Sequence, residues 1–360
     1  MTTAGDRLNQ AIQKYQGTAG ATLERVLSQV PQDAIVKANA LQFRPEPQGG
    51  VLEMSAGTDS VWRLHRHALS QVAETGNVPL TYVDHLGGRD SSPWQRELLS
   101  DVLTRTYQHS GKRHLIRAVG MNGGVREARG FLSDKYRRLD SRPLLEAFIE
   151  SARKQGGVPY SGTISDVRVA VKAIIPQVFE PVSGEAIAFG IEWFNSDFGS
   201  GRYGLRVFIL RLICVNGLVG EDLLSQVHIG GRLPDEIEFS AKTLVADTKA
   251  NILASKDIVK GALGPGGQER VFSTIRAAAE KKIEWATVRG RLSKALTKDE
   301  LRRVDEAFTG PDVVNLPAGD TAWRASNALS WIAQTIDDPD RKIDFERLAG
   351  SLVAPEKKAA

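Results

Sequence analysis

The stretch from Glu185 to Gly220 constrains the fold more than any other part of the chain, because it has the pattern of a β-hairpin. Every second residue from Ile187 to Trp193 is large and apolar, which is the period of a strand. Residues 195–204 are rich in Asn, Ser, Asp and Gly and therefore predict a loop. Residues 205–215 carry large apolar groups on both faces, so this strand is expected in the middle of a sheet that is covered on both sides.

A second strand is predicted over residues 167–175, just before the hairpin. Val169 and Val171 belong to its apolar face, whereas Arg168 and Lys172 fall on the opposite face. We therefore expect the two valines in the core and the two basic side chains on the less buried face. Because strand follows strand with short connections, the pairing should be antiparallel.

The pattern along the whole chain predicts an α+β fold with a central antiparallel β-sheet flanked by N-terminal and C-terminal helices. We expect a mostly helical N-terminal part (1–110), an antiparallel sheet core with a basic hairpin (111–235), a helical C-terminal part (236–353) and a frayed tail (354–360). Helices are predicted as two short segments within 5–30, separated by Gly17 to Gly20, and over 59–75, 94–107, 143–154, 241–260, 268–296, 298–308 and 320–336.

The composition points to a protein of an aqueous compartment. No apolar run is long enough to span a bilayer, and the N-terminal residues lack the apolar core of a signal peptide. The single cysteine, Cys214, lies inside the apolar strand and is predicted to be buried and unreactive, as in a reducing compartment. We expect a cytoplasmic location and no membrane partner.

Positive charge is concentrated between Arg105 and Arg142. This span holds ten Lys or Arg and three acids, so it carries about +7, and the rest of the chain carries about −3. A local excess of this size is felt over a Debye length of roughly 10 Å. It predicts a polyanionic partner, and the alternative is a solvated face with internal ion pairs to Glu127, Asp134 and Asp140.

Guanidinium groups bind phosphates in bidentate fashion, and aromatic rings offer platforms for unpaired bases. The basic span combines both residue types, with Tyr136 and Phe131 as its aromatic platforms, and the hairpin adds Tyr203, Arg206 and Arg211. The predicted nucleic-acid-binding residues are Arg117, Arg126, Arg129, Lys135, Tyr136, Arg137, Arg138, Arg168, Lys172, Arg202, Tyr203 and Arg206.

Other motifs do not fit their usual chemistry. Residues 199–204 match G-x-G-x-x-G and residues 197–199 spell D-F-G, but the order required of a kinase is absent and the glycines do not open a helix. His65 and His67 are two residues apart, a spacing that turns them to different sides of a helix. The sequence therefore predicts no catalytic residue, no metal and no cofactor.

Three segments in order resemble a phage and plasmid family. Residues 129–140 (RGFLSDKYRRLD) are similar to the R-A-F-L-S-D-R-Y-x-x-x-D segment of domain-of-unknown-function family 932. Residues 201–217, which end in RLICVNG, and residues 321–329 (TAWRASNAL) resemble its R-l-i-C-x-N-G and T-x-W-x-x-x-N-A segments. The loop at residues 120–124 is longer than the family's pattern. The resemblance implies a mobile-element protein of α+β build in a bacterial host cell.

We expect sequence-independent binding of single-stranded nucleic acid, with annealing during phage or plasmid recombination and with homo-oligomerisation left open. One alternative is an interaction or inhibitor protein whose basic face meets a host protein. The other is an enzyme with a site of acids and histidines, such as His114 with Asp134 and Asp140. A salt-dependent binding assay separates these readings.

Overall fold

The computed structural model of the protein describes residues 2–47, 52–57, 60–88, 90–121, 124–213, 215–226, 239–310 and 315–354. Their helices are α1 (Ala4–Ser28), α2 (Arg66–Thr75), α3 (Leu80–Gly87), α4 (Pro93–Tyr107), α5 (Ser141–Lys154), α6 (Ala241–Leu263), α7 (Pro265–Glu280), α8 (Trp285–Leu292), α9 (Lys298–Thr309), α10 (Ala322–Ala333) and α11 (Pro339–Val353), with a 3₁₀ turn at Ala38–Ala40. Their strands are β1 (Gln32–Lys37), β2 (Leu41–Pro45), β3 (Leu52–Ala56), β4 (Val61–Leu64), β5 (Arg113–Gly120), β6 (Arg126–Ser133), β7 (Val158–Ile164), β8 (Val169–Ile174), β9 (Phe179–Val182), β10 (Glu185–Asn195), β11 (Tyr203–Arg211) and β12 (Asn216–Gln226).

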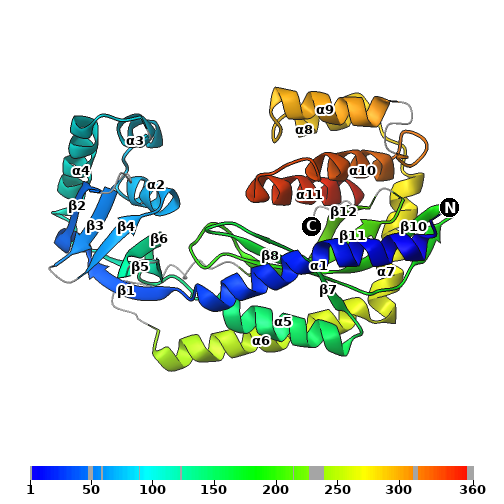
Figure 1. The fold of residues 1–360 in the computed structure, drawn as a ribbon, viewed down its shortest axis with the longest axis horizontal. Coiled ribbons are helices and arrows are strands. Elements are labelled where there is room, and N and C mark those ends of the chain that lie inside the picture. The colour runs from blue at the N-terminus through cyan, green and yellow to red at the C-terminus, as the bar shows by residue number, and fades with distance from the viewer. Residues whose placement is uncertain are drawn as a thin grey trace, which may run out of the picture.

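The first sheet has the strand order β1-β5-β6-β4-β3-β2. Its pairs are antiparallel except for β4 with β6, which run parallel. Helices α2, α3 and α4 accompany it on the left of Figure 1. Trp62, Leu69, Leu103 and Phe131 belong to the apolar core between these helices and the sheet.

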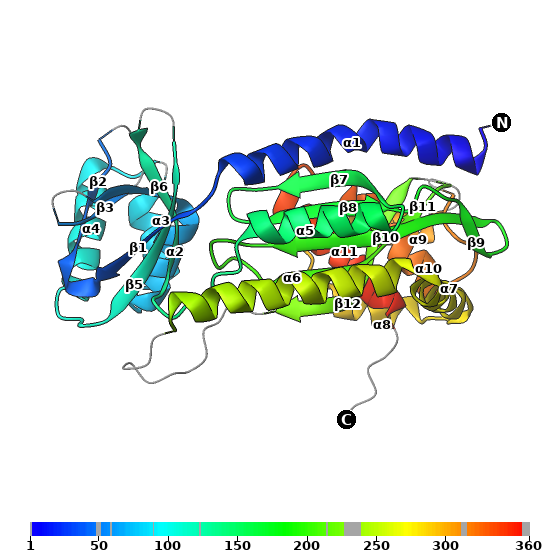
Figure 2. The ribbon, with the colours of Figure 1, turned by 90° about the horizontal axis from the view of Figure 1, so that it is seen from below.

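The second sheet has the order β12-β11-β10-β8-β7, with β9 paired to β10. Figures 1 and 2 show α5 and α6 on one face and α10 and α11 on the other, and α1 runs beside β7. Trp193 and Leu205 are fully buried in the main core of this part. The second sheet is thus the middle layer of a helix–sheet–helix arrangement.

The predicted hairpin is confirmed as the centre of this sheet. Strands β10 and β11 pair antiparallel, with Ile191 opposite Val207 and Trp193 opposite Leu205. Every residue of β11 is buried, as both apolar faces of its sequence predict. Val169 and Val171 of the neighbouring β8 are also buried in the core, as expected.

The α+β class is confirmed, but the strands form two sheets and the division at residue 110 needs correction. Strand β5, after that boundary, pairs with β1, before it. Helix α1 belongs instead to the second sheet, where Leu8 and Ala11 pack in a cluster with Phe208. The N-terminal part therefore contributes helices and four strands to the first sheet, which β5 and β6 complete.

Several helix predictions also differ from the structure, and the helix predicted over 268–296 is two helices, α7 and α8. Residues 4–28 form one continuous helix, since neither Gly17 nor Gly20 breaks it. Residues 61–64 form strand β4, and only residues 66–75 are helical. Helix α11 was not predicted at all, although Asp338 caps its start and Pro339 occupies its first turn. Cys214, residues 122–123 of the loop at 120–124, and the tail from 355 lie outside the described residues.

None of the helices in the described ranges is both long enough and apolar enough to cross a bilayer.

Gly190 in β10 is required by a close approach of two strands. A Cβ at this position would lie 1.8 Å from the carbonyl oxygen of Ala173 in β8. We expect Gly190→Ala to lower the free energy of unfolding by about 1–3 kcal/mol, because the strands must move apart. Urea unfolding measures this change. Gly120→Ala is the control, since no atom lies within 4 Å of its Cβ; equal effects of the two substitutions would contradict the prediction.

Candidate functional site

A row of alternating charges crosses one face of the second sheet. Glu192 of β10 lies opposite Lys172 of β8 and opposite Arg206 of β11, and Arg206 lies opposite Asp222 of β12. Directly opposed residues of neighbouring strands share a face, so these four side chains form one ladder. Its charges alternate in sign from strand to strand, which lets each group attract its neighbours.

Helix α11 covers this ladder. Nζ of Lys172 donates to Glu346 of α11 at 2.6 Å and lies 3.7 Å from the carboxylate of Glu192. Nε of Arg206 donates to the other oxygen of Glu192, which is fully buried. The prediction that Lys172 lies on the less buried face is therefore wrong, because α11 shields that face. Arg168, at the start of the strand, is half-buried and donates to Ser200.

The ladder ends at a cavity of about 730 Å³ beside α11. Strands β11 and β12 supply Arg206 and Asp222 to its lining, and Arg202 comes from the loop just before β11. Helix α11 supplies Arg341, Asp344 and Arg347, and the remaining lining residues are small or aliphatic. We call this cavity the arginine pocket, after these four arginines.

Three of the four arginines have a carboxylate partner. Arg202 pairs with Asp222 at 2.5 Å, Arg341 pairs with Glu300 at 2.5 Å, and Arg206 pairs with Glu192. Each guanidinium has five N–H donors, so one carboxylate leaves several of them available.

Two guanidinium groups of the pocket have unused donors. Arg206 is only 2% exposed, and its Nη2 has no hydrogen-bond partner among the described residues. Arg347 makes no hydrogen bond or ion pair with any residue in the described ranges. Partial burial lowers the pKa of Arg347, and the positive charges of Arg206 and Arg202 lower it further. A buried donor without an acceptor is costly, and an anion in the pocket would satisfy it.

The arrangement can hold an oxyanion. Planar guanidinium groups match the geometry of phosphate and carboxylate, and partial burial strengthens such contacts. Among the described residues, no three His, Cys, Asp or Glu side chains gather as metal ligands.

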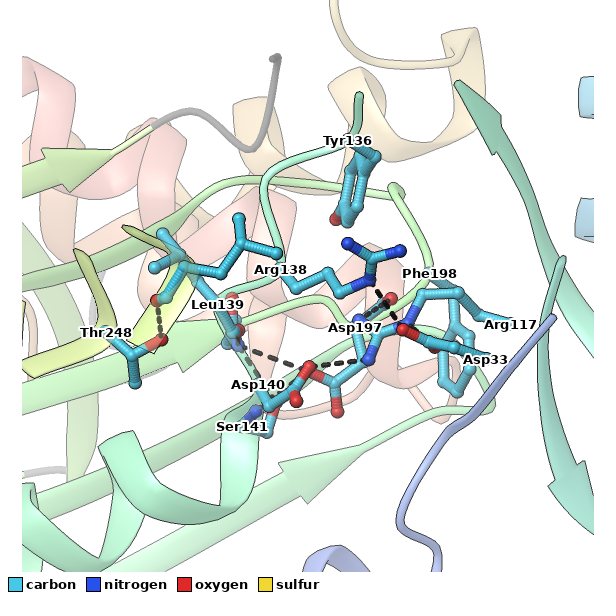
Figure 3. A network of polar contacts seen from close by, with 12 residues as sticks. Asp33, Arg117, Tyr136, Arg138, Leu139, Asp140, Ser141, Asp197, Phe198 and Thr248 are labelled. Atoms are coloured by element: carbon cyan, nitrogen blue, oxygen red, sulfur yellow. Dashed lines mark hydrogen bonds and ion pairs between the residues drawn. The ribbon is translucent and has the colours of Figure 1, made fainter. Parts of the chain in front are cut away.

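Three of the predicted binding residues, Arg117, Tyr136 and Arg138, lie instead in a polar network between the two sheets (Figure 3). Arg117 of β5 is 1% exposed, and its guanidinium donates to Asp33 at 2.9 Å and to Asp140 at 2.5 Å. A third donor bonds the main-chain oxygen of Asp197, in the loop between β10 and β11, at 2.9 Å. Arg138 donates to the same Asp33 at 2.6 Å. We call this network the Arg117 clamp.

The remaining basic residues of the span are also tied to the protein. Arg129 is 4% exposed and donates to Glu127, Gln29 and the main chain of Asp166. Arg137 pairs with Asp247 of α6, the guanidinium of Arg126 lies 5.4 Å from the Trp62 ring, and Lys135 is half-buried. These residues do not form the continuous basic surface that the charge count predicted.

The three aromatic platforms are buried. Tyr136 donates to the main-chain oxygen of Ser196, Tyr203 contacts the hydroxyl of Ser255, and Phe131 stacks on His114 with ring centroids 4.4 Å apart. None of them can stack on a nucleic-acid base without local opening. Arg211 is likewise enclosed, in a bidentate pair with Glu185.

The acid and histidine set proposed for an enzyme is not brought together. His114 is buried beside Phe131, and burial lowers its pKa. Asp134 pairs with Arg113 and Asp140 pairs with Arg117. Each acid therefore serves an ion pair instead of a shared site.

Sequence reasoning found Arg202 and Arg206 but missed Arg341 and Arg347. Both missed residues lie on α11, the helix that the pattern analysis did not predict. A usable signal was present in the strands: Lys172, Glu192 and Arg206 are single charges within otherwise apolar runs. Such charges need buried partners and so indicate a polar site.

Asp197 gives the clamp a pH dependence. Its carboxylate accepts hydrogen bonds from the main-chain N–H and the hydroxyl of Ser141, at 2.8 and 2.9 Å. Burial raises the pKa of Asp197 to about 6, with a further rise from Asp140. A folded-state pKa above the unfolded value means that the native protein binds the extra proton, so this contribution is complete below about pH 4 and is lost as pH rises through 6.

We therefore expect the stability of the natural protein, relative to Asp197→Asn, to fall as pH rises from 4 to 6. The slope should be at most about 1.4 kcal/mol per pH unit. Urea unfolding of both proteins at several pH values measures the difference, which removes the contributions of other carboxylates. Parallel pH profiles of the two proteins would contradict this role of Asp197.

Comparison with protein-family models, with curated proteins and with solved structures gives no match for this chain. The resemblance to domain-of-unknown-function family 932 therefore stays a prediction from the sequence.

Proposed function

We propose that the protein binds single-stranded nucleic acid through its phosphates, in the arginine pocket. The observation that carries this proposal is the pair of unused guanidinium donors, Nη2 of the buried Arg206 and the side chain of Arg347. The ligand class is the one expected from the sequence, but the site is different. Of the twelve predicted residues, Arg202 and Arg206 line the pocket.

The pocket favours phosphate contacts over base contacts. No Phe, Tyr or Trp is among the described residues that line it. Base recognition without sequence preference usually depends on aromatic stacking, whereas phosphate recognition depends on Arg and Lys. Binding is therefore expected to be independent of sequence and sensitive to salt. Annealing during phage or plasmid recombination would be the use of such binding that the family resemblance suggests.

Fluorescence anisotropy with labelled single-stranded DNA, single-stranded RNA and double-stranded DNA tests the proposal. Counterion release predicts that log K falls with log salt, with a slope of about 0.7 per phosphate neutralised on a single strand. Arg347→Gln removes a charged donor, which is expected to weaken binding roughly 10- to 100-fold. It should also reduce the slope by about 0.7.

Arg105→Gln is the matched control. Arg105 is an exposed helical arginine near the first sheet, and its only ion partner in the described structure is Asp101. The Arg105→Gln variant should therefore bind the labelled nucleic acids as tightly as the natural protein does. Absence of binding at low salt would refute the proposal and favour a protein partner for the pocket. Equal weakening by Arg347→Gln and Arg105→Gln would also refute it, because binding would then reflect overall charge.

A further inference from the structure

We propose that the arginine pocket takes a terminal phosphate, a phosphomonoester at the end of a nucleic-acid strand, in preference to the internal phosphodiesters. This inference rests on the proposed function and specifies the part of the strand that is bound.

The size of the pocket supports an end-binding mode. A cavity of about 730 Å³ is in the range of sites that enclose a small ligand. Proteins that track a strand instead use an extended groove, with sites of roughly 4–16 nucleotides. A pocket of this size has room for one chain end but not for several successive nucleotides.

The number of donors also exceeds what a phosphodiester can use. Arg347 offers its whole guanidinium and Arg206 offers Nη2, and Arg202 and Arg341 keep N–H groups beyond those bonded to Asp222, to Glu300 and to the main-chain oxygen of Ala295. A phosphodiester has two free oxygens and a single negative charge. A terminal phosphate has three strong acceptor oxygens and about 1.5 to 2 negative charges at pH 7.

The buried ladder fixes the guanidinium of Arg206, which is one of the residues that line the pocket. Glu192, fully buried, accepts from Nε of Arg206 and leaves Nη2 without a partner. Glu192 is in turn opposed by Lys172, which is held by Glu346. Arg206 is therefore oriented before a ligand arrives, which lowers the entropic cost of binding.

The experiment compares three labelled oligonucleotides of one sequence: with a 5′-phosphate, with a 3′-phosphate and with neither. Anisotropy is measured with the natural protein, Arg347→Gln and Arg105→Gln. We expect at least one phosphorylated end to raise affinity roughly tenfold, the effect of one additional charged hydrogen bond. Arg347→Gln should remove most of this preference for a phosphorylated end, and Arg105→Gln should keep it. A nucleoside monophosphate should compete with the phosphorylated oligonucleotide for the pocket.

The outcomes separate this inference from the proposed function. If all three oligonucleotides bind equally and Arg347→Gln weakens them equally, the end preference is refuted and strand binding stands. If no oligonucleotide binds but a nucleoside monophosphate or inorganic phosphate does, in a manner lost in Arg347→Gln, strand binding is refuted and the pocket is a site for small phosphates. If none of these ligands binds, both proposals are refuted.

Discussion

Replacing Arg117 with Met is expected to lower the free energy of unfolding by about 3–5 kcal/mol, the usual result of removing one partner from a buried ion pair. The side chain is 1% exposed and bonds Asp33, Asp140 and the main chain of Asp197. Its loss leaves Asp140 without its guanidinium partner, whereas Asp33 keeps Arg138. It also frees the β10–β11 loop from the first sheet, so urea unfolding should show the full effect.

Arg138→Met is the control for the Arg117 clamp. Arg138 pairs with the same Asp33, but its side chain is 21% exposed. Exposed pairs are worth little, so the expected loss is about 1 kcal/mol or less. If the two substitutions had similar small effects, the clamp would not be a main contact between the sheets.

Replacing Lys172 with Met should lower the free energy of unfolding by about as much as replacing Arg117. Lys172 lies between Glu346 and Glu192, which are 6% and 0% exposed. Without the lysine, Glu346 loses its hydrogen-bonded partner in a buried place, which costs about 3–5 kcal/mol. Urea unfolding monitored by far-ultraviolet circular dichroism measures the loss and reports whether α11 is still folded.

The double variant Lys172→Met with Glu346→Met tests whether the unpaired charge of Glu346 causes the loss of stability in Lys172→Met. Removing both members of the pair leaves no unpaired charge at this place, and Glu192 keeps Arg206 as its partner. We therefore expect the double variant to recover most of the stability lost by Lys172→Met. Losses that simply add would contradict the role of Lys172 as a charge partner for Glu346.

The local patterns of the sequence predicted the three central strands of the second sheet. Strands β8, β10 and β11 follow one another with short connections, so period-two alternation and turn residues are sufficient to place them. In the first sheet only the basic hairpin, β5 with β6, was predicted, and the pairing of the other strands could not be found in this way. Its strands β1 and β5 are far apart in sequence, and β4 pairs with β6 in parallel, so nothing local specifies their contact.

The binding residues were harder to predict than the fold. A charge count along the sequence cannot distinguish a free arginine from a paired one, because the partners are distant. Asp33 is 84 residues from Arg117, and Asp247 is 110 residues from Arg137. The basic span is therefore mostly a set of ion pairs that join the elements. The unused donors lie where β11 and α11 meet, a contact that only the tertiary structure shows.

A crystal structure of the protein with a 5′-phosphorylated or 3′-phosphorylated single-stranded oligonucleotide, whichever binds more tightly, tests the central claim most directly. We predict a phosphate in the arginine pocket, with its oxygens within hydrogen-bond distance of Nη2 of Arg206 and of the Arg347 guanidinium. An oligonucleotide bound on another surface, with the arginine pocket free of it, would contradict this account.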